Sequence, residues 1–145
     1  MKRRIATLDR AAREALLAAA RAAAEHAYAP YSRYGVGAAV RTDDGRVFTG
    51  VNVENASYGL TICAERAAVA AAVAAGARRL TAVAIAATRA PLPTPCGACR
   101  QVLSEFAPPE TPVYVAGAGG TAHRHRLGAL LPHGFNFRPS RDRAP

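Results

Sequence analysis

Alanine-rich segments with leucine or valine at helical spacing alternate along this chain with short, continuous apolar runs. The helical spacing predicts three helices, over residues 7–28, 62–75 and 97–106. The apolar runs predict four strands, over residues 36–41, 46–53, 80–87 and 112–115. Gly76 is well placed to end the second helix, and Thr42-Asp43-Asp44-Gly45 is typical of a hairpin turn.

The order of these elements indicates the fold class. Helices between apolar strands imply crossover connections and a sheet that is covered on both faces. We expect the first two strands to be antiparallel and the later ones parallel, with a weak fifth strand at 121–126 and a short helical turn at 127–131. The sequence therefore predicts an α/β fold, a three-layer α/β/α sandwich with a mixed five-stranded sheet. We expect one domain over 1–145, with flexible basic tails at 1–6 and 138–145.

Composition and charge limit the classes of function. The chain has 145 residues, of which 50% are hydrophobic, yet no apolar run approaches the ~18 residues of a membrane span. With no secretory signal pattern either, we expect a cytoplasmic protein without membrane partners. The net charge of +9 raises the possibility of nucleic-acid binding. Lys2 is the only lysine, however, and the arginines are scattered with clusters at the two ends, so nucleic acid is not the expected partner.

The three cysteines carry the first chemical signal. Cys63 begins the second predicted helix, and Cys96 and Cys99 open the third. Helix N-termini favour thiolates, and thiolates are good ligands for tetrahedral Zn²⁺. Only three cysteines for four positions leave one position open, which is the mark of a catalytic site. The alternatives are three unrelated buried cysteines, or a structural site closed by one of the histidines His26, His123, His125 and His133.

Two charged residues follow Cys63. Glu65 is two positions further on, and residues at that spacing do not share a helix face, so it is not expected to be a ligand. It could still carry protons beside the metal, although a first-turn glutamate is also favoured by the helix dipole. Three thiolates leave a zinc site with a formal charge of −1. Arg66 is the first candidate to compensate that charge and Arg100 the second, the alternative being surface arginines.

The motifs C-A-E-R at 63–66 and P-C-G-A-C-R-Q at 95–101 resemble those of the zinc-dependent cytidine deaminases of the small homotetrameric type. The resemblance runs from Tyr31 to Phe135. It implies one Zn²⁺ per subunit and hydrolytic deamination of cytidine and 2′-deoxycytidine to uridine and 2′-deoxyuridine, with release of ammonia, as in pyrimidine salvage. No redox or nucleotide cofactor is needed. The resemblance assigns the residues as metal ligands Cys63, Cys96 and Cys99, catalytic Glu65 and substrate-binding Ala64.

The segment Gly50–Ala56 resembles the family's sugar-binding segment. Asn52 and Glu54 alternate at the end of a strand, so both side chains can point to one face. An amide and a carboxylate together can donate to and accept from a sugar hydroxyl. The resemblance assigns the pair to the ribose 3′-hydroxyl, and the alternative is an exposed strand end with two polar residues.

The resemblance also implies roles for aromatic residues. Tyr34 stands where the family often has a phenylalanine near the pyrimidine ring, although packing in a core or an interface would also explain it. Phe135 matches an aromatic that reaches a neighbouring subunit's site, and Ala56 and Tyr58 lie in a segment near a neighbour's pocket. We therefore expect a homotetramer with shared active sites. Residues 136–145 depart from the family pattern, so no contacts are transferred to them.

Three other functions compete with this interpretation. The chain could deaminate a related base-bearing substrate, such as a blasticidin-type nucleoside antibiotic. It could act on transfer RNA or single-stranded DNA, but such deaminases typically use histidine as the first ligand and need a basic, aromatic groove. It could also be a non-catalytic zinc module that binds RNA through its basic ends. Asn52 and Glu54 favour an ordinary nucleoside over the first, and Cys63 weighs against the second.

Overall fold

A five-stranded sheet forms the centre of the computed structural model, which describes residues 7–137. The predicted tails at 1–6 and 138–145 lie outside this range. The strands run in the order β2-β1-β3-β4-β5 and span β1 (Val36–Thr42), β2 (Val47–Val51), β3 (Leu80–Ala87), β4 (Pro112–Ala116) and β5 (Ala122–Arg126).

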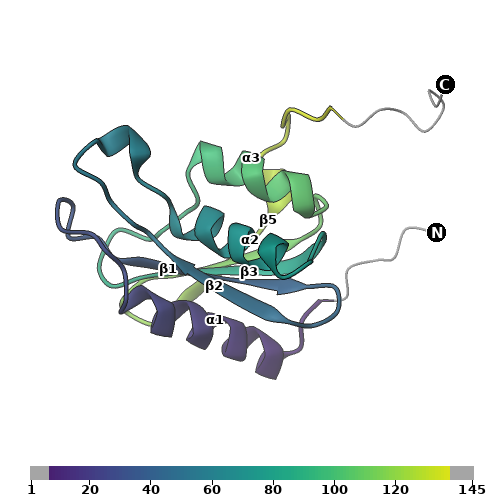
Figure 1. Cartoon of the computed structure of the whole chain (residues 1–145). Coiled ribbons are helices and arrows are strands. Elements are labelled where there is room, and N and C mark those ends of the chain that lie inside the picture. Colours follow the sequence, from purple (N-terminus) through teal and green to yellow (C-terminus); the bar gives the residue numbers. More distant parts are fainter. Residues whose placement is uncertain (1–6, 138–145) are drawn as a thin grey trace, which may run out of the picture.

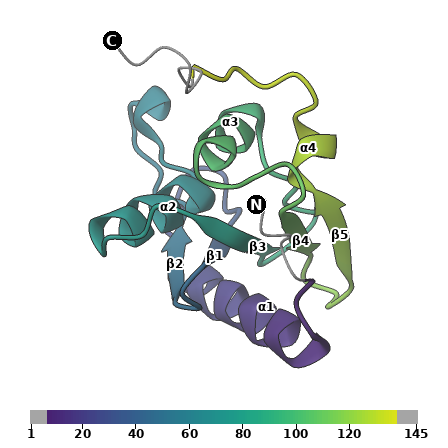
Figure 2. The same ribbon diagram turned by 90° about the vertical axis from the view of Figure 1, so that its right-hand side faces the viewer.

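Helices cover both faces of this sheet, as the sequence predicts (Figure 1). On one face lies α1 (Arg10–Ala24), and on the other lie α2 (Ala64–Ala74) and α3 (Gly97–Phe106), side by side (Figure 2). A 3₁₀ turn, η1 (Tyr58–Leu60), precedes α2, and α4 (Leu127–Leu130) follows β5. The three-layer α/β/α sandwich is confirmed. Among the described helices, none is long and apolar enough to cross a membrane.

Strand directions differ in part from the expectation. Antiparallel pairing joins β1 to β2, as predicted, and also joins β1 to β3 and β4 to β5. Only β3 and β4 are parallel. The connections explain this, because parallel strands need a long crossover. The crossover through α2 passes β1, so β3 runs parallel to β2 but antiparallel to its neighbour β1, whereas the crossover through α3 leads from β3 to the adjacent β4. Residues 117–121 are too few for a crossover, so β5 folds back as an edge hairpin.

The helix ends show where local and distant interactions compete. The first helix is shorter than the predicted 7–28, because Asp9 caps it by accepting from the Ala12 N–H at 2.7 Å. At its other end the Tyr28 N–H donates to the Asn52 carbonyl at 3.0 Å, which takes that residue out of the helix. The second helix stops before Gly76, whose φ of +91° is the left-handed conformation that glycine tolerates best.

Two glycines let the helices approach the sheet at backbone distance. A Cβ on Gly37 in β1 would lie 2.1 Å from the Ala20 carbonyl oxygen of α1. A Cβ on Gly50 in β2 would lie 2.3 Å from the Ala68 nitrogen of α2. The second contact fixes the height of α2 above the sheet, and therefore the position of the residues at its N-terminus.

Candidate active site

The three cysteines meet where two helices begin. Cys63 is the N-cap of α2, Cys96 is the N-cap of α3, and Cys99 lies in the first turn of α3. The Cys63 and Cys96 sulfurs are 4.0 Å apart, those of Cys96 and Cys99 are 3.5 Å apart, and all three lie within 4.8 Å of one another. The predicted cluster of thiols is thus present, although Cys63 and Cys96 are 33 positions apart in sequence.

The donor set and its spacing fit zinc. Sulfur ligands at about 2.3 Å from a tetrahedral zinc ion would lie about 3.8 Å from one another, close to the observed separations. No histidine or carboxylate in residues 7–137 joins the three sulfurs within this cluster. The alternative of a structural site closed by a histidine therefore has no support in the described part of the chain.

The thiols strongly affect one another's ionisation. Hydrogen bonding from the Cys99 thiol, and then from Arg66, lowers the pKa of Cys63 to about 5. The contact with Cys63, together with burial, raises the pKa of Cys99. Without a metal ion, the crowded thiols therefore ionise unequally, Cys63 more readily than Cys99. Because a divalent cation displaces thiol protons, metal binding at this cluster should release protons.

The two arginines that follow the cysteines do different things. The Arg66 Nη2 atom lies 3.8 Å from the Cys63 sulfur and donates to the Thr61 carbonyl at 3.1 Å. Arg66 therefore places positive charge on the cluster. Arg100 donates instead to the carbonyl oxygens of Pro95, at 2.7 Å, and Leu130, at 2.8 Å. Its contacts are those of a structural tie between α3, the loop before it and α4.

Glu65 is buried beside the sulfurs and is not one of the clustered ligands. Its side chain is among the few buried carboxylates of the described chain, with 5% of the residue exposed. Burial, and after it the negative charge of Cys63, raises the pKa of the Glu65 carboxyl. The residue is therefore suited to hold a proton near the metal cluster and to release it.

Asn52 and Glu54 both act on the segment of residues 31–36. The Asn52 amide donates to the Tyr34 carbonyl and accepts from the Val36 N–H, each at 2.8 Å. The Glu54 carboxylate accepts from the Tyr31 N–H at 2.9 Å and the Ser32 N–H at 3.2 Å. The two side chains therefore contact the same segment of the chain. Each keeps further hydrogen-bonding capacity, so their role in sugar binding stays a prediction.

Tyr34 reaches across from this segment to the loop before α3. Its hydroxyl donates to the Pro91 carbonyl, a contact that the sequence did not predict. Burial, and then the charge of Glu65, raises the pKa of Tyr34, so the ring lies within electrostatic reach of that carboxylate. Of the other predicted substrate residues, Ala64 is fully buried, whereas Ala56 and Tyr58 are exposed around η1.

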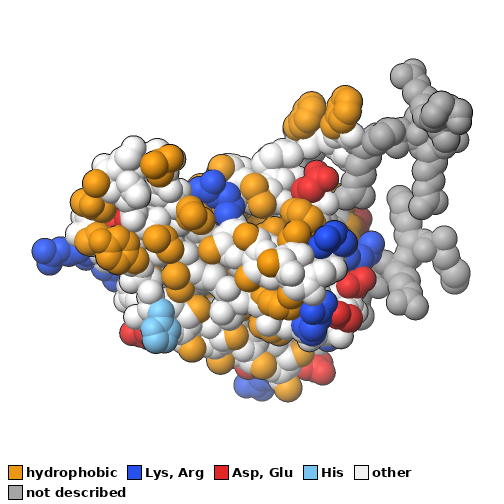
Figure 3. All heavy atoms as spheres, in the orientation of Figure 1, with side chains coloured by type: hydrophobic (Ala, Val, Ile, Leu, Met, Phe, Trp, Pro, Cys, Tyr) orange, Lys and Arg blue, Asp and Glu red, His pale blue; other side chains and the backbone are white. Residues whose placement is uncertain are grey.

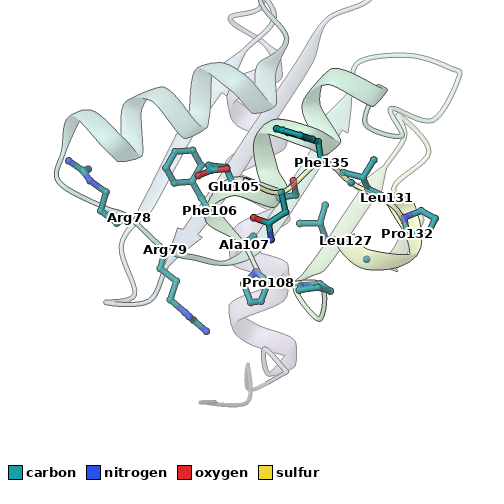
Figure 4. A pocket seen from close by; sticks show the side chains of 15 residues that line it. Arg78, Arg79, Glu105, Phe106, Ala107, Pro108, Leu127, Leu131, Pro132 and Phe135 are labelled. Atoms are coloured by element: carbon teal, nitrogen blue, oxygen red, sulfur yellow. The ribbon is translucent and has the colours of Figure 1, made fainter. Parts of the chain in front are cut away.

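Phe135 lies apart from the thiols of its own chain. It forms part of the wall of a surface hollow of about 550 Å³, together with Arg78, Phe106 and Leu127 (Figure 4). None of the three cysteines lines that hollow. The Gln101 side chain holds the Phe135 backbone, donating to its carbonyl at 2.8 Å and accepting from its N–H at 3.1 Å. Sequence reasoning missed this role of Gln101, although the residue closes the second cysteine motif.

Comparison with known proteins agrees with this geometry. Residues 10–115 match the family described as "Cytidine and deoxycytidylate deaminase zinc-binding region". The cytidine deaminase of Halalkalibacterium halodurans is 47% identical over 131 residues, which cover 90% of this chain and 98% of that protein. The chain belongs to the cytidine deaminase family. The cytidine deaminase of Mycobacterium tuberculosis is 49% identical over 115 residues, covering 79% of this chain and 83% of the relative.

Solved cytidine deaminases share the fold. The crystal structure from Burkholderia pseudomallei has a TM-score of 0.80 and 49% identity, covering 84% of this chain and 98% of that one. The structure from Mycobacterium tuberculosis has a TM-score of 0.78 and 45% identity, covering 90% and 100%. The predicted family and fold class are thus confirmed. This cytidine deaminase family member is a hydrolase, and its zinc-binding region holds the cluster Cys63, Cys96 and Cys99.

Proposed function

We propose that this chain hydrolytically deaminates cytidine and 2′-deoxycytidine, giving uridine or 2′-deoxyuridine and ammonia, as pyrimidine salvage requires. The observation that carries the proposal is the buried Glu65 carboxyl beside three sulfurs at the spacing of zinc ligands. The identity with proteins named cytidine deaminase supports the same substrate class. Three free thiols agree with a cytoplasmic location. One domain over the whole chain remains part of the proposal.

Each residue near the cluster has a separate part in the proposed reaction. Cys63, Cys96 and Cys99 hold one zinc per subunit, which supplies a Lewis acid that makes water nucleophilic near neutral pH. Glu65 accepts one proton of the attacking water and delivers it to the ring N3, then accepts the second proton of the same oxygen and delivers it to the amine, which leaves as ammonia. Ala64 is fully buried, backbone included, so its part in substrate binding rests on the family resemblance.

Arg66 offsets the negative charge that three thiolates leave on the site. Its guanidinium is held 3.8 Å from the Cys63 sulfur by the bond to the Thr61 carbonyl. A positive charge at that distance reduces the electron density that Cys63 gives to the metal. Arg66 would thereby keep a zinc ion held by the three cysteines a stronger Lewis acid.

Asn52 and Glu54 bind the ribose 3′-hydroxyl, and Tyr34 offers its ring to the base. The pKa of Glu54 is lowered by hydrogen bonds from Ser32 and then Tyr31, so the side chain is an anionic acceptor at neutral pH. Asn52 retains one amide hydrogen that can be donated. An acceptor and a donor on the same wall match the two hydrogen-bonding roles of a hydroxyl group.

We further propose a homotetramer in which subunits share active sites. Exposed apolar side chains surround the segment before α2, and backbone bridges join Tyr28 to Val53 and Val53 to Ile62. Apolar atoms also cover much of the face over α2 (Figure 3). Phe135 and Phe137 stack with ring centroids 6.5 Å apart, although 74% and 84% of these residues are exposed. A second copy of the chain would bury these groups, bringing Phe135, Ala56 and Tyr58 to neighbouring pockets.

The decisive experiment is an ultraviolet assay of cytidine and deoxycytidine turnover, before and after removal of zinc with a chelator. We expect turnover that disappears with the metal and returns when zinc is added. A zinc-loaded protein that turns over a blasticidin-type nucleoside but neither cytosine nucleoside would move the proposal to that substrate. A zinc-loaded protein that turns over none of these nucleosides but retains RNA would favour the non-catalytic module.

A further inference from the structure

The backbone and the hydroxyl of Tyr34 are bonded to two different segments that border the site. Its N–H donates to the Ser32 hydroxyl at 3.0 Å, and its carbonyl accepts from the Asn52 amide at 2.8 Å. The backbone therefore belongs to the wall that Asn52 and Glu54 hold. The hydroxyl, in contrast, donates to the carbonyl of Pro91, in the loop that leads to Cys96.

That loop has few other ties. In the described chain, no side chain other than Tyr34 hydrogen-bonds to residues 89–93. Pro91 and Pro93 have no N–H to donate, and the loop carbonyl of Leu92 accepts only from the nearby Thr94 N–H. Pro91 and Leu92 are exposed, so packing alone does not fix the outer part of the loop. The Tyr34 hydroxyl therefore joins a weakly held loop to a firmly held wall.

The position of the ring places this contact at the catalytic centre. The hydroxyl is bonded to the loop that leads to Cys96, and burial, followed by the charge of Glu65, raises the pKa of Tyr34. Because the hydroxyl is already bonded to Pro91, it is not free to exchange protons with a substrate. Tyr34 is half-buried, so part of its ring remains accessible.

We propose that Tyr34 is a positioning residue, whose bond to the Pro91 carbonyl holds loop residues 89–93 against the segment 31–36 and sets the width of the base-binding slot. This inference rests on the proposed deaminase function. It assigns the hydroxyl to substrate binding and leaves the chemical step to Glu65. Removing the hydroxyl should therefore change KM and leave kcat nearly constant.

The test compares Tyr34→Phe with the wild-type zinc enzyme. A hydrogen bond contributes about 0.5–1.5 kcal/mol net, so KM for cytidine should rise roughly 2- to 12-fold, with kcat within about twofold. The inhibition constant of the product uridine should rise by a similar factor. Zinc content should not change. Independently of activity, the backbone amides within residues 89–93 should exchange with deuterium faster in the variant.

Tyr114→Phe is the matched control, because it removes the same atom from a tyrosine that packs with α1 on the other face of the sheet. It should leave KM and the exchange of the loop unchanged. Tyr34→Leu removes the ring as well, and should lower kcat/KM further than Tyr34→Phe does. Should Tyr34→Phe not fold, faster loop exchange in Tyr34→Leu provides the same test.

Several results would overturn the inference. One is an active wild type with Tyr34→Phe at the same KM and the same loop exchange. Another is a fall in kcat alone, which would place the hydroxyl in the chemistry. If the wild type does not turn over cytidine at all, the proposed function fails. The deuterium exchange of the loop then decides by itself whether the Tyr34 hydroxyl holds the loop.

Discussion

Glu65 combines two properties that proton transfer needs. It is buried, so its carboxyl is neutral more readily than an exposed one, and it lies beside the metal ligands without being one of them. A group whose pKa moves toward the working pH can act first as a base and then as an acid. The location at the first turn of α2 keeps the carboxyl fixed while this happens.

The first prediction is that Glu65→Gln keeps its zinc and fold but loses about 10²- to 10⁴-fold in kcat, because an amide of the same size cannot carry the proton. Steady-state kinetics and metal analysis on the same sample provide the measurement. Glu14→Gln, at an exposed site on α1, is the control and should be unaffected. Activity within a few-fold of the wild type would remove Glu65 from the mechanism.

The second prediction concerns Glu54 and pH. Its pKa lies below the ordinary value of 4.5, so between these two values the unfolded state binds more protons than the folded state. The stabilisation by Glu54 is therefore complete above about pH 4.5 and is lost as the pH falls through the lowered pKa. Thermal melts of wild type and Glu54→Gln should differ at pH 7 and converge in acid. A gap that stays constant with pH would contradict this assignment.

The sequence was sufficient to predict the residues whose signals are local. Cys96 and Cys99 share one motif, and Cys63 with Glu65 shares another, so the cluster and its neighbouring carboxylate could be inferred. The bonds from Tyr34 to Pro91 and from Gln101 to Phe135 could not. They join residues 57 and 34 positions apart, and the acceptors are backbone carbonyls, which every residue carries.

At the scale of elements, close contact between α-helices and the sheet positions the site. Gly37 allows α1 to approach β1, and Gly50 allows α2 to approach β2. The N-terminus of α2 holds Cys63 and Glu65, so the second contact also determines where these side chains lie above the sheet.

The third prediction is that Gly37→Ala and Gly50→Ala each destabilise the protein. The added Cβ would meet backbone atoms, which cannot rotate away, so we expect losses at or above the usual 1–3 kcal/mol of overpacking, about 2–4 °C in Tm for each kcal/mol. Gly119→Ala is the control, since nothing lies within 4 Å of its added Cβ. Calorimetry would measure all three. Equal melting temperatures would mean that the helices can shift at little cost.

Periodicity predicted the type of each main helix and strand, but not every partner. The alanine pattern continues beyond Ala24, and only the pairing of Tyr28 with the end of β2 shows why α1 stops. Likewise, nothing within β3 reveals that it lies antiparallel to β1. That arrangement depends on which edge of the β1–β2 hairpin β3 joins, and this is decided only when the whole sheet assembles.

At the scale of the whole molecule, the fourth prediction is that assembly and substrate binding depend together on Phe135. Phe135→Ala should raise KM and shift the assembly toward smaller species, and Gln101→Ala should do the same more weakly because it releases the Phe135 backbone. Light scattering and kinetics on the same samples would measure both effects. A core phenylalanine would lower Tm without changing either.

Mixed assemblies make the same prediction sharper. Subunits with Glu65→Gln, combined with subunits carrying Phe135→Ala, should regain part of the activity if sites are shared. Some sites in the mixture then have an intact Glu65 from one subunit and an intact Phe135 from its neighbour. Glu65→Gln subunits reassembled with themselves are the control and should remain inactive. A monomer that is fully active at catalytic dilution would rule out sharing.

The cysteine cluster has a consequence for the chain as a polymer. A metal held by Cys63 and Cys96 closes a loop between residues 33 positions apart, so it acts as a reversible cross-link. Ligand binding to the native state adds RT ln(1 + [L]/Kd), so each tenfold rise in free zinc above Kd adds about 1.4 kcal/mol to stability. The folded fraction of this protein, and with it its lifetime against proteolysis, would therefore follow the zinc supply of its surroundings.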